Sequence, residues 1–203
     1  MFILSYGVPL ENCKDKDYRV IESEIEKKYR DAGYSISERR YKITERDDYS
    51  VICPEYRNKP SGLEPVVILP DFVVPGRRYP VYVYLYAIDL YSANPDKGQR
   101  WAAAATRRYF GLTTFAHTTL GRALKAFVRN TEDEAADEDA FAEGSTAAKA
   151  AEFPTAQATG LLRKKAARFF QGRLATAPVP QKAAAIGCKL ARECFKRHRR
   201  FLL

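Results

Sequence analysis

Apolar residues stand singly among charged ones along the first quarter of the chain, a pattern that favours strands over buried helices. From Tyr18 to Ile52, tyrosine, isoleucine and valine recur between charged side chains. Asp31-Ala32-Gly33 suits a hairpin turn, because Gly33 can adopt a positive φ at little cost. We therefore predict a small antiparallel β ribbon whose strands end near Cys53, followed by one short strand over 64–69.

The segment Val81 to Tyr91 (VYVYLYAIDLY) fits two patterns. The strict alternation of its first residues favours a strand. Pro80, however, suits the first turn of a helix, and apolar residues of the segment also recur on one helical face. The helices predicted directly after it favour a helix here as well.

Two helices joined by a glycine turn come next. Gln99 to Phe110 (QRWAAAATRRYF) is rich in alanine, and Gly111 stands where a helix C-cap favours glycine. A further helix is predicted from about Thr114 to Arg129. Its core face comprises Leu120, Ala123, Leu124, Phe127 and Val128, at the spacing of one helical face. Such a pair is the sequence form of a helix-turn-helix, whose second helix lies in the DNA major groove.

The remainder of the chain changes composition twice. Residues 130–153 are mostly Ala, Glu and Asp and are predicted to be a linker, either helical or disordered. Two basic amphipathic helices follow, about Ala156 to Ala175 and Gln181 to Phe201. We expect an α+β protein with a β ribbon over 1–75, a helix-turn-helix over 76–129, an acidic linker over 130–153 and basic C-terminal helices over 154–203.

The net charge of +9 is distributed unevenly. Residues 1–52, 53–129, 130–153 and 154–203 carry −1, +6, −7 and +11, which add to +9. Basic blocks attract polyanions by releasing condensed counterions, which makes nucleic acid the first partner to consider. No apolar run approaches the length of a membrane span, and no convincing signal peptide is present. We therefore expect a cytoplasmic protein without a membrane partner, in which cysteines stay reduced.

The second predicted helix of the pair has an outer face of hydroxyl and cationic side chains without an acid. Arginine can pair bidentately with guanine, and threonine offers a hydroxyl or a methyl group to base edges. The expected partner is double-stranded DNA. The candidate DNA-contacting residues are Thr114, His117, Thr118, Arg122, Lys125 and Arg129, with Arg107 and Arg108 from the preceding helix.

Two motifs occur in a familiar order. The first motif comprises Leu69-Pro70-Asp71-Phe72, Pro75 and Arg78-Tyr79. The second motif follows the hydrophobic segment and reads FGLTTFAHTTLGRALKAF (Phe110 to Phe127). This order resembles a group of largely uncharacterised bacterial zinc-ribbon and helix-turn-helix proteins related to transposase front ends. The resemblance covers roughly residues 10 to 129. It implies DNA binding in a protein derived from a mobile element, and a helix for Val81 to Tyr91.

The resemblance also implies a zinc ribbon, and here the chain departs from the pattern. Each knuckle needs two cysteines three residues apart, but Cys53 is followed by Tyr56, and Cys13 stands without a partner at that spacing. Two thiolates cannot close a tetrahedral site that needs four ligands. Cys13 and Cys53 are the only candidate zinc ligands, and the alternative is a metal-free ribbon held by Tyr, Ile and Val packing. No other cofactor is expected. The position four before Gly111, commonly a small alanine in such motifs, is Arg107.

Catalytic motifs are missing from the sequence, since no Ser/His/Asp order, phosphate-binding glycine loop or HExxH occurs in it. We expect a protein that is not an enzyme. Three other interpretations stay open: an RNA-binding protein that uses its tyrosines and basic tail, a protein-interaction module whose C-terminal helices form a homodimer, and a decaying fragment of a mobile-element gene.

Overall fold

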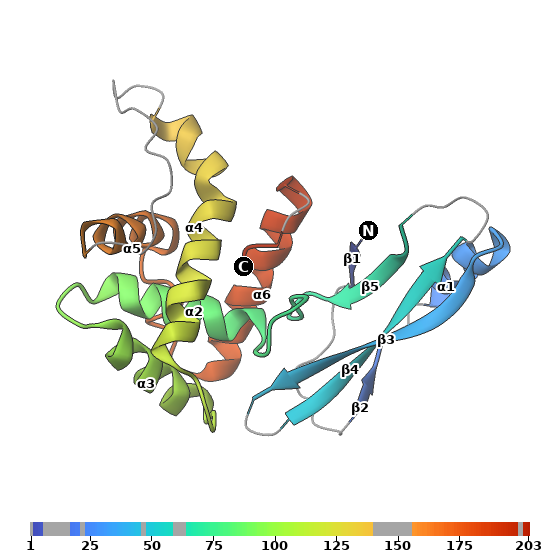
Figure 1. The fold of residues 1–203 in the computed structure, drawn as a ribbon, viewed down its shortest axis with the longest axis horizontal. Coiled ribbons are helices and arrows are strands. Elements are labelled where there is room, and N and C mark those ends of the chain that lie inside the picture. The colour runs from blue at the N-terminus through green and yellow to red at the C-terminus, as the bar shows by residue number, and fades with distance from the viewer. Residues whose placement is uncertain are drawn as a thin grey trace. The chain divides into compact units, whose positions relative to one another are not determined.

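The computed structural model describes residues 2–5, 17–20, 23–45, 48–58, 64–139, 156–198 and 201–203. Contacts divide the chain into two compact units. The first comprises Met1–Val81 with Phe110–Thr113, and the second comprises Tyr82–Tyr109 with Thr114–Leu203. Strands lie in the first unit and most helices in the second (Figure 1). The α+β class, with strands preceding helices, is therefore confirmed.

A mixed sheet forms the first unit. Its described elements are β1 (Phe2–Ser5), β2 (Asp17–Arg19), α1 (Ser23–Asp31), β3 (Ser35–Thr44), β4 (Asp48–Arg57) and β5 (Val66–Pro70). β4 pairs antiparallel with β3 along its whole length, and antiparallel with β5 at its far end. β2 runs parallel to β4, and β1 runs parallel to β5. The expectation of a purely antiparallel ribbon is therefore wrong.

The hairpin turn also lies elsewhere than predicted. Gly33 has a φ of +78°, but its N–H donates to the carbonyl of Arg30, and the Tyr34 N–H donates to that of Tyr29. These are the bonds of a helix C-terminus, so Gly33 ends α1. The hairpin connects Thr44 to Asp48 instead. The pattern Ser23-Glu24-Ile25-Glu26, with Ser three residues before Glu, is a helix start signal that our strand prediction passed over.

β4 continues straight through the stretch that resembles a zinc knuckle. Cys53 pairs with Arg39, and Tyr56 pairs with Ile36, within one uninterrupted ladder. Residues three apart in a strand are separated by about 10 Å, whereas a knuckle folds them into a tight turn. Pro54, which has no N–H to donate, lies between the part of β4 that pairs with β2 and the part that pairs with β5. The prediction that strands end near Cys53 is wrong.

The second unit is built around a helix that is buried on every side. It comprises α2 (Val81–Ala93), α3 (Gln99–Phe110), α4 (His117–Asp139), α5 (Ala156–Phe170) and α6 (Pro180–His198). All of α2 from Val81 to Ser92 is buried, which explains why its sequence lacks a polar face. The helix prediction for this segment is confirmed. α3 has the predicted bounds, whereas α5 ends at Phe170, before the predicted Ala175.

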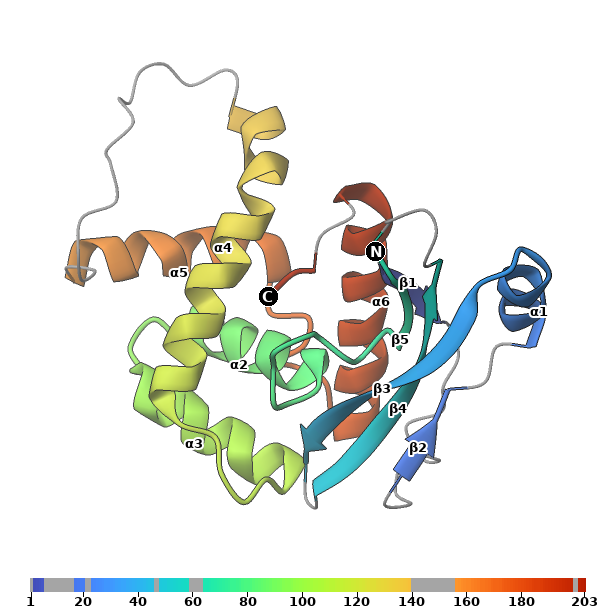
Figure 2. The same ribbon diagram turned by 45° about the vertical axis from the view of Figure 1, so that its right-hand side comes forward.

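The two C-terminal helices are integral to this unit. Asp89 of α2 is fully buried, and its carboxylate accepts the N–H groups of Gly172, Leu174 and Ala175 at 2.7–3.1 Å. α6 approaches α2 so closely that a Cβ on Gly187 would lie 2.7 Å from the Cβ of Tyr82. The hydroxyl of Tyr109 donates to the Ala177 carbonyl at 2.7 Å. These contacts hold the segment between α5 and α6 against α2 and α3 (Figure 2).

Candidate nucleic-acid interface

α3 and α4 are the two helices that the sequence analysis expects to form a helix-turn-helix. The buried face of α3 is made of small residues, Ala102, Ala103 and Thr106, which lets neighbouring backbones come close. Gly111 has a φ of +66°, as a glycine that ends a helix requires. α4 begins at His117 rather than at the predicted Thr114. Thr114 therefore lies in the connecting turn, where its side chain is exposed, and does not extend the outer stripe of α4.

The inner face of α4 is packed as predicted. Leu120, Ala123, Leu124, Phe127 and Val128 are all buried. Phe127 stacks on Phe170 of α5 with ring centroids 4.9 Å apart, and meets Phe169 edge-on at 5.0 Å. The Asn130 side chain donates to the Phe201 carbonyl at 2.9 Å. α5 and the C-terminal residues thus cover one side of α4 and fix its orientation.

The outer face of α4 remains exposed. Thr118, Arg122, Lys125 and Arg129 follow one another at helical spacing and are all exposed, as is His117 in the first turn. Within the described part of the chain, no ion pair engages Arg122 or Lys125. The Arg129 Nε donates to the neighbouring Asn130 side chain, at 3.4 Å. We call these four residues the α4 stripe.

The preceding helix adds cations to the same unit. Arg107 and Arg108 are exposed in the last turn of α3, so the size of Arg107 does not disturb the turn that follows. From residue 97 to residue 131 the sequence holds seven lysines and arginines and no acidic residue. The sequence prediction had left out two exposed residues at the start of α3, Arg100 and Trp101. The sequence did indicate these two positions, because the small residues at 102, 103 and 106 mark the buried face of α3 and place 100 and 101 on its outer side.

α4 does not stop where the cationic residues end. It continues to Asp139, so the first ten residues of the predicted acidic linker are helical, and residues 140–155 lie outside the described residues. Glu132 begins the acidic segment directly after Asn130 and Thr131. In sequence, this single helix therefore carries a cationic segment followed by an acidic one.

Of the two candidate zinc ligands, one lies within the described residues. Cys53 is fully buried in β4, and burial raises the pKa of its thiol to about 12, whereas a zinc ligand is a thiolate. Cys13 lies outside the described residues. Across the described ranges, no three His, Cys, Asp or Glu side chains gather into a group that could hold a metal ion. Cys188 and Cys194 are buried in α6. Zinc-ribbon character stays a prediction of the resemblance alone.

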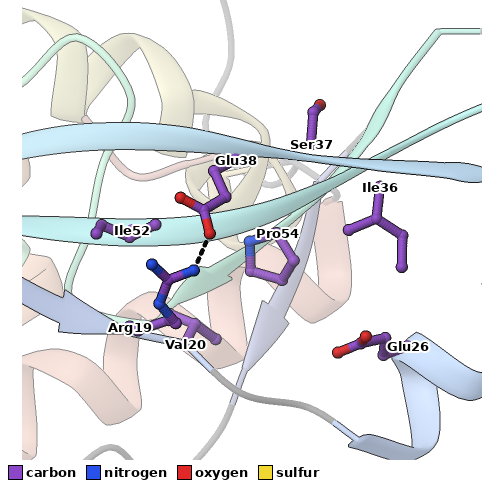
Figure 3. A pocket seen from close by; sticks show the side chains of 8 residues that line it. All are labelled: Arg19, Val20, Glu26, Ile36, Ser37, Glu38, Ile52 and Pro54. Carbon is purple, nitrogen blue, oxygen red and sulfur yellow. Dashed lines mark ion pairs between the residues drawn. The ribbon is translucent and has the colours of Figure 1, made fainter.

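A small pocket lies in the first unit (Figure 3). It measures about 160 Å³, and its wall comprises Arg19, Val20, Glu26, Ile36, Ser37, Glu38, Ile52 and Pro54. Arg19 of β2 and Glu38 of β3 point toward each other and form an ion pair across it. Ligand pockets usually occupy about 300–1,000 Å³, and the lining offers no nucleophile paired with a base. We assign no chemistry to this pocket.

No helix of the described residues combines the length and the apolar character that a membrane crossing requires. Comparison of the chain with protein-family models, with curated proteins and with solved structures finds no match. The likeness to transposase front ends therefore rests on the residues quoted above, and the functional proposals rest on the α4 stripe.

Proposed function

We propose that the protein binds double-stranded DNA sequence-selectively, with α4 as its recognition helix. The observation that carries this proposal is the α4 stripe, an exposed row of hydroxyl and cationic side chains on a helix whose other face is packed. A rigid helix with such a row matches the major groove in width and in chemistry. By resemblance, the protein is derived from a mobile element and acts without catalysis.

Each part of the interface has a distinct role in this proposal. Arg122, in the middle of the stripe, offers two parallel N–H donors to the O6 and N7 atoms of guanine, and Thr118 offers a hydroxyl or a methyl group. Lys125 and Arg129 contact phosphates along the groove. His117 adds its ring, and the positive end of the helix dipole at the start of α4 favours a phosphate at the same end.

Further cations supply affinity without selectivity. Arg107 and Arg108 lie at the end of α3, and Thr114 in the turn offers one more hydroxyl. Exposed lysines and arginines also project from α5 and α6, namely Lys164, Arg168, Lys182, Lys189, Lys196 and Arg197. Because α5 and α6 pack against the same helical unit, these cations move with the recognition helix rather than on a free tail. Each phosphate contacted steepens the salt dependence of log K by about 0.9.

The test is to select a preferred duplex from a random pool and to measure its affinity against that of random duplex. Arg122→Ala is expected to weaken the preferred duplex by about 1–3 kcal/mol and the random duplex by less. Lys27→Ala removes one exposed cation from α1 and serves as the matched control, with no change expected. Equal affinities of Arg122→Ala and the unsubstituted protein for the preferred duplex would overturn the proposal.

The same assay separates the alternatives. Single-stranded RNA is included as a competitor, and displacement of the duplex by RNA at lower concentration would favour the RNA-binding interpretation. A homodimer through α5 and α6 stays a prediction, and sedimentation of the free protein tests it. Their buried faces pack within the helical unit, so a second copy would meet their outer faces, which are mostly cationic.

A further inference from the structure

The exposed side of α3 carries an aromatic residue among cations. Arg100, Trp101, Ala104, Arg107 and Arg108 are all exposed and lie on one side of the helix, which we call the α3 outer face. Trp101 is the sole tryptophan of the chain, and 39% of its surface is exposed. Among the described residues, no other ring is stacked on it. Ala104, three positions after Trp101, is the one small side chain of this face.

The start of α3 lies against α4, the recognition helix of the proposed function. The Gln99 carboxamide at the start of α3 lies 3.1 Å from the point where a Cβ on Gly121 of α4 would stand. Residues two apart in a helix are turned by about 200° around its axis, so Trp101 faces away from the contact with α4, on the far side of α3. A nucleic-acid ligand that reaches both Arg122 and Trp101 must therefore extend around α3.

We propose that Trp101 stacks on an unpaired base of DNA, with the arginines of the α3 outer face holding the adjoining phosphates. An indole offers a flat apolar surface to any base, and base stacking on an aromatic side chain needs no particular sequence. The three arginines and the lack of any acid from 97 to 131 make the face complementary to a polyanion. The protein then prefers DNA in which the duplex beside the recognition site is locally open.

This inference rests on DNA binding by α4, and its test separates the two. The probes are a paired duplex and the same duplex with a short central bubble of unpaired thymines. The unsubstituted protein should bind the bubble more tightly, and its fluorescence, excited where tyrosine does not absorb, should be quenched more by the bubble. Trp101→Ala should lower affinity for the bubble by about 5-fold to 100-fold, toward that of the paired duplex.

Two variants serve as controls. Trp101→Phe keeps an aromatic surface and should retain most of the preference for the bubble. Leu161→Ala removes another exposed apolar side chain, 56% exposed on α5, and should change neither affinity. Unchanged far-UV circular dichroism of each variant shows that the fold is kept.

Three results would overturn the inference: equal affinity for both probes, an equal loss for both probes in Trp101→Ala, or fluorescence that does not respond to the bubble. A fluorescence response to polyglutamate alone would identify the α3 outer face as a surface for acidic proteins instead. In any of these cases, Arg122-dependent binding of the paired duplex would still support the proposed function.

Discussion

Two glycine substitutions within helices test how the C-terminal helices are anchored. Replacing either Gly187 of α6 or Gly160 of α5 by alanine should favour the helical conformation by about 0.5–1 kcal/mol. A Cβ at Gly160 meets nothing within 4 Å, whereas at Gly187 it would lie 2.7 Å from the Tyr82 Cβ and 2.9 Å from its Cα. Carbon atoms in contact prefer about 3.5–4.0 Å, so α6 and α2 must separate by about 1 Å.

The two variants should therefore shift stability in opposite directions. Overpacking of this kind costs about 1–3 kcal/mol, and here the nearer atoms belong to a buried helix rather than to a flexible chain end. Gly160→Ala should raise the melting temperature slightly, and the melting temperature of Gly187→Ala should lie about 2–12 °C below that of Gly160→Ala in a circular-dichroism melt, at about 2–4 °C per kcal/mol. Equal melting temperatures would show that α6 does not pack on α2 at Tyr82.

Two further predictions concern buried ionisable groups. Asp89→Asn places an amide donor against backbone N–H groups and should lower the free energy of unfolding by about 2–4 kcal/mol, measured by urea denaturation. Burial raises the pKa of Asp89 above 3.8 by more than the N–H groups of Ala175, Leu174 and Gly172 lower it, so the folded state holds this proton more tightly than the unfolded state. The contribution of Asp89 to stability is therefore full below pH 3.8 and falls as the pH rises through the folded pKa. The difference in free energy of unfolding between the unsubstituted protein and Asp89→Asn should shrink over the same rise in pH. A difference that stays constant with pH would contradict this. At a pKa of about 12, fewer than about one Cys53 thiol in 10⁴ is ionised at pH 7. Iodoacetamide should therefore leave Cys53 unmodified in the native protein and modify it once denaturant is added. Rapid labelling of Cys53 in the native protein would refute its burial.

The helical half of the protein was largely predictable because its signals are local. The apolar spacing of Leu120, Leu124 and Phe127 and the glycine at 111 depend only on neighbours in the sequence, and the inner face of α4 is buried as expected. The start of α4 was placed three residues too early. Thr114 fits the helical spacing, and sequence periodicity carries no information on where the connecting turn ends.

The sheet was less predictable because its pairing is set by distant residues. The parallel partners of β4 and β5 come from the beginning of the chain, and no local pattern indicates which strand lies beside which. α1 was missed since its tyrosine and isoleucine suit strands, while Gly33 suits a hairpin turn and a helix end equally. The anchoring of α5 and α6 by Asp89 joins residues more than eighty positions apart, and a lone acid in an apolar segment does not reveal its partners.

Amine footprinting of the DNA complex tests the central claim most directly. Lys125 of the α4 stripe and Lys27 of α1 are both exposed, so the free protein should be acetylated readily at both. With the selected duplex bound, the account predicts that acetylation of Lys125 slows strongly while that of Lys27 is unchanged, as read by mass spectrometry. Unchanged acetylation of Lys125 in the fully bound complex would contradict the assignment of α4 as the recognition helix.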